Sequence, residues 1–573
     1  MNTELNQFLD EHIKPSNDTN IVDVFPIRCG LGKSTYIKYR LYQALSTNEK
    51  LIIVTDEIDR LKDYITDSDL IEYIKRNQNK LTLLTSDNIS TELKTLHLKN
   101  IVLMTTQRYF NFTVEEIKEL TKNRKIIIFD EKPYFSEQIK INIKTFNNID
   151  TALHIALDNT VELTNKDWLI TQWEILRTKF QNIIKEYEQL NTKGKLELWH
   201  YKDNETISEN DEQFIKLINK YRLKLQRYDI ESYKNILAII QIVYDGATFT
   251  SCKIKSKTLE QKYENYFTVF INNKDKMIAS GAKIYVLDGT ADISPDYDVS
   301  YVNIVNCSDF MLPLNKLTIN CVNITTSRNR FDKPDRNEYI DCIVDYIKSL
   351  PNKCDVIFTY QKIEPILKKH FNIINHFGNI KGKNNYRDKT DIIQVGLYRY
   401  SDLTYKLQAG YNALEKYEGR KITIVSGKSK IDTVMYNTIL ADIEQNLYRT
   451  KIRNTDNTDM VTYTILFNTN QYKYLIELLK TRYGSYGATI NVIDTPLDFK
   501  LLKAKERKQD TNTKKILEWL LMKTKGDIFH ISNMLSELNL TQKQFRRIKG
   551  KDTSIKELFE NMKTNKRGYY TIK

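Results

Sequence analysis

The sequence predicts an α/β protein with two parallel-sheet domains, a helical insertion and a small basic C-terminal domain. Its 573 residues exceed what one hydrophobic core usually supports. Two series of short runs rich in Ile, Val and Leu alternate with helical patterns, as strands buried on both faces of a parallel sheet require. Between the two series, apolar residues recur instead at steps of three and four, which is typical of long helices.

The first series of strands is expected within residues 1–139. The candidate strands are residues 21–27, 51–55, 81–85, 101–105 and 125–129. Each run is bounded by polar turn residues and separated from the next by a helical pattern. This alternation predicts a parallel sheet covered by helices.

Residues 140–280 are predicted to form a helical insertion. Two apolar stripes carry this prediction: Leu169, Trp173, Leu176, Phe180, Ile183 and Tyr187, then Phe214, Ile218, Tyr221, Leu225 and Tyr228. Each stripe lies along one face of a helix. A strand pattern returns at residues 284–287, so we expect the first domain to resume over residues 281–310.

The second series of strands is expected within residues 311–480. The candidates lie near residues 317–322, 355–360, 391–395, 422–425 and 462–467. The repeated alternation indicates a second copy of the same architecture. Residues 481–510 are interpreted as a polar, basic linker.

The helical patterns and basic charge of residues 511–573 predict a winged-helix or helix-turn-helix domain that binds DNA. Residues 501–573 hold 18 Lys and Arg against 8 Asp and Glu, most of the chain's net charge of +14. Thr541 is a candidate N-cap for a helix that bears Lys543, Arg546, Arg547 and Lys549, which suits a DNA groove. Residues 568–572 resemble a wing strand. The alternative is a small helical bundle that serves protein contacts.

Composition excludes several other classes of protein. The longest apolar stretch, residues 236–244, is about half the roughly 20 residues that span a bilayer, and the N-terminal residues lack the pattern of a signal peptide. We therefore expect a cytoplasmic protein with no membrane partner. Six cysteines without CxxC spacing indicate neither a zinc site, an iron–sulfur cluster nor a disulfide framework.

The strongest chemical signal lies between the first predicted strand and the helix after it. It is the run Gly30, Leu31, Gly32, Lys33, Ser34 and Thr35. Glycines let the backbone wrap a phosphate, a lysine reaches the terminal phosphates and a serine hydroxyl can bind Mg²⁺. Ile27 stands where the longer GxxxxGK[ST] pattern has glycine, but the GxGK[ST] form fits. The run predicts a binding loop for ATP with Mg²⁺.

A second signal is the apolar strand that ends in Asp130 and Glu131. In a phosphate-loop ATPase, an acid at this strand end holds the Mg²⁺ shell, and the next glutamate can orient and deprotonate the attacking water. We interpret Asp130 as the metal residue and Glu131 as the base.

With these two motifs the chain resembles the superfamily 2 helicases, which use GxGK[ST] as motif I and a DExx box as motif II. Residues 287–292 (LDGTAD) resemble motif III, and residues 445–453 (QNLYRTKIR) resemble motif VI. The resemblance implies two RecA-like domains and an arginine finger, for which Arg449 is the better match. Arg453 falls one residue later than the usual spacing. Motif II reads DEKP, neither DEAD nor DEAH.

The resemblance also implies contacts with a nucleic-acid backbone. Arg60, Thr106 and Arg108 follow strands at positions that touch phosphate in helicases. We expect an ATP-dependent helicase or translocase, acting on DNA more than RNA, in replication or repair of a phage, plasmid or low-GC bacterial genome. Replication proteins are candidate partners. The alternatives are a duplex translocase that does not unwind, and a DNA-binding initiator or regulator that uses ATP as a switch.

Overall fold

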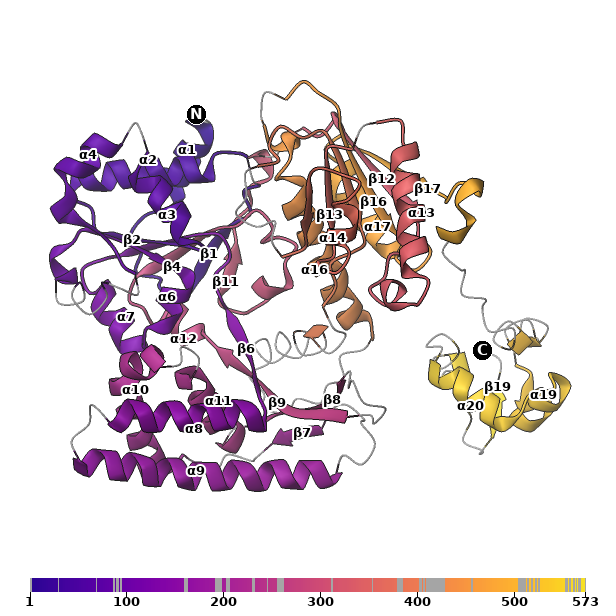
Figure 1. The fold of residues 1–573 in the computed structure, drawn as a ribbon, viewed down its shortest axis with the longest axis horizontal. Coiled ribbons are helices and arrows are strands. Elements are labelled where there is room, and N and C mark those ends of the chain that lie inside the picture. Colours follow the sequence, from indigo (N-terminus) through magenta and orange to yellow (C-terminus); the bar gives the residue numbers. More distant parts are fainter. Residues whose placement is uncertain are drawn as a thin grey trace. The chain divides into compact units, whose positions relative to one another are not determined.

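The computed structural model describes most of residues 3–502 and shorter stretches of residues 512–571 (Figure 1). The longest stretches outside the described residues are 191–197, 202–206, 255–261, 379–384, 409–427 and 503–511. The chain forms two compact units. The first combines Met1–Lys316, Gly378–Thr390 and Tyr398–Val461, and the second combines Leu317–Phe377, Asp391–Leu397 and Thr462–Lys573.

The first unit is built on a seven-stranded sheet in the order β11-β1-β10-β5-β2-β4-β3. All six neighbouring pairs are parallel. Alternate residues of one strand enter two different apolar clusters, as Ile52 and Ile53 do, so both faces of the sheet are buried. The strands are β1 Val22–Phe25, β2 Leu51–Thr55, β3 Leu81–Leu83, β4 Ile101–Thr105, β5 Ile126–Asp130, β10 Lys283–Leu287 and β11 Val302–Ile304.

Helices cover this sheet, as the alternating pattern predicts. They are α1 Thr3–His12, α2 Lys33–Thr47, α3 Ile58–Ile65, α4 Ile71–Arg76, α6 Thr106–Asn111, α7 Val114–Thr121 and α12 Lys274–Ile278. Helix α16, Lys428–Leu447, also belongs to the first unit, although it lies in sequence between two strands of the second sheet. Among the described residues, no helix combines the length and apolarity that a bilayer span requires.

The insertion contains the predicted helices but is not purely helical. Its helices are α8 Ile143–Asp158, α9 Leu163–Leu190, α10 Glu209–Tyr228 and α11 Ser232–Tyr244. It also contains an antiparallel sheet in the order β6-β9-β8-β7, made of β6 Ser136–Ile141, β7 Leu198–Tyr201, β8 Gly246–Ile254 and β9 Lys262–Asn272. These strands mix polar with apolar residues, so they lack the continuous apolar runs by which the parallel strands were predicted.

The second unit contains a six-stranded sheet in the order β14-β13-β15-β16-β12-β17. The pairs β12–β17, β13–β14, β13–β15 and β15–β16 are parallel. The strands are β12 Leu317–Asn323, β13 Val356–Thr359, β14 Ile374–His376, β15 Asp391–Val395, β16 Val461–Phe467 and β17 Thr489–Ile493. The helices are α13 Arg336–Ser349, α14 Glu364–Leu367 and α17 Lys473–Leu479. The predicted fold class of two parallel-sheet α/β domains is confirmed.

Two details of the second domain differ from the prediction. Strand β17 lies within residues 481–510, so this segment is not only a linker. It was missed because the strand is an exposed edge, where Val492 is 52% exposed, and its neighbours are polar. The strand predicted at residues 422–425 lies outside the described residues.

The described part of the C-terminal domain has a small apolar core that includes Ile516, Phe529, Met534 and Phe545. Helices α19 Ile531–Glu537 and α20 Gln542–Lys551 are consecutive, and β18 Ile528–His530 pairs antiparallel with β19 Tyr569–Thr571. Thr541 starts α20 through a reciprocal cap: its hydroxyl accepts from the Gln544 amide at 3.2 Å, and the Gln544 side chain accepts from the Thr541 amide at 2.7 Å. The winged-helix assignment stays a prediction.

Candidate active site

The candidate active site lies at the carboxyl ends of four adjacent strands of the first sheet. In the order β1-β10-β5-β2, Phe25 pairs with Leu287, Leu287 with Asp130, and Asp130 with Thr55. The phosphate loop follows β1, and the residues that resemble motif III follow β10. Parallel α/β sheets bind ligands at this edge, because the chain turns away there and leaves helix N-termini and polar side chains facing outward.

The phosphate loop depends on two glycines with left-handed backbones. Gly30 has a φ of +94° and Gly32 a φ of +107°, which side-chain-bearing residues rarely adopt. Gly32 is the N-cap of α2. Because glycine has no side chain, this residue does not cover the first backbone amides of the helix. The next two side chains, Ser34 and Thr35, are exposed, while Leu31 is buried.

Lys33 lies under this loop. Its side chain is buried, and its Nζ donates to the Ile27 carbonyl oxygen at 2.7 Å. Its charge also favours ionisation of the carboxyls of Asp130, Glu131 and Asp288. The lysine is therefore held between the loop and the acids of the neighbouring strands.

Asp130 is fully buried, and its two carboxylate oxygens differ in their surroundings. Its Oδ2 accepts a hydrogen bond from the Tyr64 hydroxyl, while its Oδ1 has no hydrogen-bond partner among the described residues. Burial raises the pKa of Asp130, and Arg60 opposes that rise. A buried, unsatisfied carboxylate oxygen is costly unless a cation or donor meets it. Together with the exposed hydroxyl of Ser34, it fits the oxygen ligands that Mg²⁺ prefers.

Glu131 is held as a carboxylate in a strained backbone. Its φ is +96°, unusual for a residue with a long side chain and often found at functional sites. Burial alone would raise its pKa, but the positive charges of Lys33, Arg60 and Arg449 together lower it. The glutamate is therefore ionised at neutral pH, as a proton acceptor must be.

The segment that resembles motif VI reaches the phosphate loop within the first unit. Arg28, fully buried just before the loop, donates from Nη1 to the Tyr448 hydroxyl at 3.0 Å, and its Nε lies 3.6 Å from Glu444 Oε1. A side chain at Gly30 would collide with the backbone carbonyl of Arg453. Arg453 thus contributes its backbone at the loop, whereas Arg449 contributes its charge near Glu131.

Arg60 is not placed for the nucleic-acid contact that was predicted for it. Its Nη1 lies 3.2 Å from Asp56, 3.5 Å from Asp130 and 3.4 Å from Glu131, and its side chain is only 15% exposed. The helix after β2 therefore turns this guanidinium toward the active-site acids, because three carboxylates at adjacent strand ends attract it more strongly than solvent does.

Thr106 is also misassigned as a nucleic-acid contact. It is buried, and its hydroxyl donates to the Thr55 carbonyl at 3.0 Å, which links the end of β2 to the start of α6. A hydroxyl that satisfies a backbone carbonyl in the core stabilises the sheet and cannot reach a phosphate. Arg108, by contrast, is partly exposed, and its amide donates to the Thr105 side chain. In the C-terminal domain, Lys543, Arg546 and Arg547 are exposed and Lys549 is partly exposed on α20.

Sequence reasoning missed three residues of the site: Arg28, Tyr64 and Asp288. Asp288 is buried after β10, accepts from the Thr290 amide at 3.0 Å and from the Tyr297 hydroxyl at 2.7 Å, and has a pKa raised by burial and by Glu131. Because Asp288 lies in the segment that resembles motif III, the sequence contained a signal that could have identified it as a site residue. Arg28 and Tyr64 carried no signal, because their partners lie far away in sequence.

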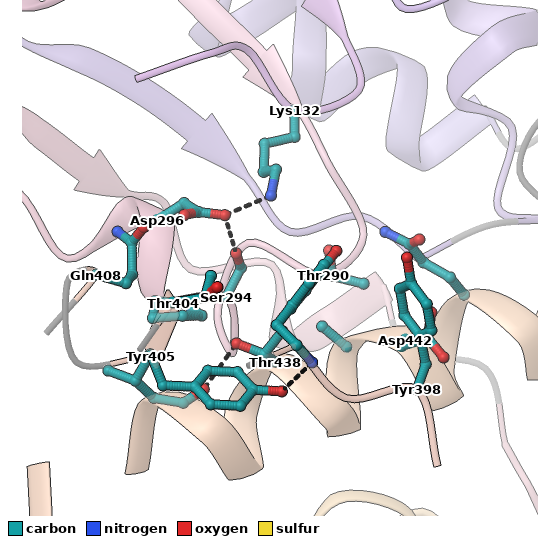
Figure 2. Close-up of a pocket in the computed structure, with 15 residues that line it drawn as sticks. Lys132, Thr290, Ser294, Asp296, Tyr398, Thr404, Tyr405, Gln408, Thr438 and Asp442 are labelled. Carbon is teal, nitrogen blue, oxygen red and sulfur yellow. Dashed lines mark hydrogen bonds and ion pairs between the residues drawn. The ribbon is translucent and has the colours of Figure 1, made fainter. Parts of the chain in front are cut away.

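A cavity of about 220 Å³ lies beside these residues, lined entirely by the first unit. Figure 2 shows the ion pair of Lys132 and Asp296 on one side of this cavity and Tyr405 on another. Lys132 directly follows Glu131, and Thr290 and Ser294 follow Asp288, so one wall continues from the acids. The other wall includes Thr438 and Asp442 of α16. Residues of the segments that resemble motifs II, III and VI therefore line one cavity, the last of them through Gln445.

No family model matches the chain, and no curated protein matches it. Among solved structures, Xpd4 of S. tokodaii is similar at a TM-score of 0.44 and 13% identity, over 85% of this chain and 99% of that chain. Mss116p bound to ssRNA and AMP-PNP has a TM-score of 0.31 and 10% identity, over 93% of this chain and 82% of that chain. The helicase MrfA bound to DNA and AMPPNP has a TM-score of 0.31 and 10% identity, over 91% of this chain and 57% of that chain. These likenesses are distant.

Proposed function

We propose that this protein is a nucleic-acid-dependent ATPase of the helicase or translocase type. One observation carries the proposal. The phosphate loop, the acids Asp130 and Glu131 and the charge of Arg449 converge at one edge of a parallel sheet, although Arg449 lies more than 300 residues downstream in sequence. Superfamily 2 helicases, which the motifs resemble, use this set of groups for phosphoryl transfer to water.

The roles of the residues follow from their positions. Lys33 and the first amides of α2 would bind the phosphates of ATP. Ser34 and Asp130 would hold Mg²⁺, which supplies positive charge to the phosphate oxygens when it is bound. Glu131 would orient the attacking water and accept its proton. Arg449 would stabilise the negative charge that develops on the transferring group.

The nucleic-acid partner is supported by charge and by the C-terminal domain. Helix α20 exposes three basic side chains on a well-capped helix, and most of the net charge of +14 lies in residues 501–573. A basic helix of this kind suits a DNA groove better than the deep, narrow major groove of RNA. We therefore infer that DNA is the preferred partner, in replication or repair.

The test is ATP turnover with no nucleic acid, single-stranded DNA, duplex DNA and RNA. We expect DNA to stimulate turnover, and a strand-displacement assay beside a single-strand translocation assay separates unwinding from translocation. Turnover that DNA leaves unchanged, together with a footprint at one DNA sequence, would contradict a motor and support an initiator or regulator.

A further inference from the structure

One buried arginine connects the phosphate loop to the segment that carries Arg449. Arg28 lies three residues after the end of β1, and its carbonyl oxygen accepts from the Leu31 amide at 3.4 Å, so its main chain is part of the loop. Its side chain is fully buried and reaches Tyr448, which lies 420 residues later in sequence. Both residues belong to the first unit. A single residue therefore contributes its backbone to the loop and its side chain to the end of α16.

The guanidinium of Arg28 contacts two side chains at the end of α16. Its Nη1 donates to the Tyr448 hydroxyl at 3.0 Å, and its Nε lies 3.6 Å from Glu444 Oε1. Its central carbon also lies 5.7 Å from the centre of the Tyr448 ring, within the range of a cation–π interaction. Glu444 and Tyr448 are four residues apart, and the Tyr448 amide donates to the Glu444 carbonyl at 3.0 Å, so both side chains lie on one face of a helical turn. The planar fork of an arginine can contact both at once.

Burial makes this arrangement specific. The side chains of Arg28, Glu444 and Tyr448 are all nearly inaccessible to solvent. A buried charge is stable only with a partner, so the carboxylate of Glu444 and the guanidinium of Arg28 depend on each other. The end of α16 is therefore held at the loop by a contact that water cannot replace.

The same contact fixes the backbone that carries Arg449. Arg449 directly follows Tyr448, and Tyr448 and Thr450 are buried, whereas Arg449 is partly exposed. The backbone is thus anchored on both sides of Arg449, and on one side the anchor is the residue that Arg28 holds. The charge of Arg449 in turn helps to lower the pKa of Glu131.

We propose that Arg28 is a positioning residue, which holds the turn after α16 at the phosphate loop and thereby aims Arg449 at the transferring phosphoryl group. The proposal rests on the proposed function, in which Arg449 acts as the arginine finger. A finger stabilises developing charge only if its guanidinium is already in place, and a displacement of about 1 Å can cost roughly 10²-fold in rate. Arg28 thus acts through Arg449, and the loop and the finger form one unit.

The kinetic test separates turnover from ATP binding. Tyr448→Phe removes only the hydroxyl that accepts from Arg28, and Arg28→Met removes both contacts. We expect kcat to fall about tenfold in Tyr448→Phe and on the order of 10²-fold in Arg28→Met. KM for ATP changes by less than about twofold, because Lys33 and the backbone of the loop remain. The measurement is steady-state turnover with single-stranded DNA, well below the melting temperature of each variant.

A matched variant controls for the loss of a buried hydrogen bond. Tyr463 is also fully buried, and its hydroxyl donates to Gln394 at 2.6 Å in the second unit. Tyr463→Phe lowers the melting temperature as Tyr448→Phe does, but keeps the kcat of the wild type. An equal fall of kcat in both variants would show that the loss of stability causes it, which overturns the positioning role.

Arg28→Lys keeps the test valid if Arg28→Met does not fold. A lysine keeps a positive charge for Glu444, but its single nitrogen cannot contact Glu444 and Tyr448 together as the fork does. We expect Arg28→Lys to fold and to show a kcat close to that of Tyr448→Phe. The wild-type kcat in Arg28→Lys would show that charge alone suffices and that the contact with Tyr448 positions nothing.

A double-mutant cycle tests whether Arg28 acts through Arg449. The probe is ADP with aluminium fluoride, which imitates the transferring phosphoryl group in the transition state. Tyr448→Phe lowers the affinity for this complex about tenfold and leaves the affinity for ADP unchanged. In the background of Arg449→Ala, the same substitution has no further effect, because the residue that it positions is absent. An equal loss of affinity in both backgrounds would overturn the proposal.

The outcomes distinguish this inference from the proposed function. A wild-type protein that hydrolyses no ATP refutes the motor. A wild-type protein that hydrolyses ATP, with turnover impaired in Arg449→Ala but unchanged in Tyr448→Phe and Arg28→Lys, refutes the positioning role alone.

Discussion

The two parallel sheets share an architecture, but their carboxyl ends differ in chemistry. In the first sheet, the ends of β2, β5 and β10 carry Asp56, Asp130, Glu131 and Asp288, and one buried oxygen of Asp130 has no partner among the described residues. In the second sheet, the two residues after each inner strand are uncharged. The fold alone therefore does not decide where phosphate chemistry occurs. The residues at the strand ends do.

At the carboxyl ends of the second sheet several polar groups are satisfied internally, although the buried Asn323 Oδ1 at the end of β12 has no hydrogen-bond partner among the described residues. Thr326 donates to the Leu466 carbonyl at 2.6 Å, and the Tyr360 hydroxyl donates to the Leu397 carbonyl at 2.8 Å. Such closed hydrogen bonds stabilise a domain but offer little to a ligand. This difference predicts that substitutions at equivalent strand ends will have unequal effects on turnover.

The largest difference in ATP turnover is expected between Lys33→Ala and Thr326→Val. Lys33→Ala removes the positive group under the phosphate loop and should abolish measurable ATP turnover, with a thermal melt close to that of the wild type. Thr326→Val removes a hydrogen bond of the second sheet and should cost about 1 kcal/mol of stability with turnover retained. The checks are steady-state turnover and thermal melts without nucleotide. Equal loss of turnover in both variants would remove the distinction between the sheets.

Arg449 tests the comparison of the two sheets in another way. It follows α16, which lies in sequence between strands of the second sheet, but its expected role is at the carboxyl edge of the first sheet. Arg449→Ala should lower turnover at saturating ATP by roughly 10³ to 10⁵, since a finger binds charge that develops in the transition state. Nucleotide affinity, measured with a fluorescent analogue, should change little. A variant that only weakened ATP binding would refute the finger role.

The two glycines of the loop provide a matched pair. Both have positive φ, so alanine strains either one by on the order of 1 kcal/mol. At Gly30 the new methyl group also collides with the Arg453 backbone, whereas nothing lies within 4 Å at Gly32. We therefore expect Gly30→Ala to lower thermal stability more than Gly32→Ala. The opposite order would show that residues 444–453 do not pack on the loop.

The smallest effects are expected in the C-terminal domain, outside both parallel sheets. Arg546→Ala and Arg547→Ala should each reduce the log–log salt slope of duplex DNA binding by about 0.9 while basal ATP turnover stays constant. If either arginine contacts a base, sequence preference should also relax. Unchanged DNA affinity and slope in both variants would assign this domain to a protein partner.

The sequence predicted most of the fold and the residues proposed for the centre of the site, but only where the signal was local. Continuous apolar runs identified the inner strands, and the glycines with Lys33 identified the loop. The edge strand β17 and the insertion's antiparallel sheet lacked such runs. Arg28 and Tyr64 became visible only with folding, because their partners lie 420 and 66 residues away. Arg60 was misassigned because a sequence does not show which way a helix turns its side chain.

Glu131→Gln tests most directly whether the edge of the first sheet hydrolyses ATP. The amide has nearly the same shape as the carboxylate but cannot accept the proton of the attacking water. We predict that ATP binding, measured with a fluorescent analogue, persists, while turnover under saturating ATP and single-stranded DNA falls to background. Turnover at the wild-type rate would contradict the assignment of Glu131 as the base and with it the proposed active site.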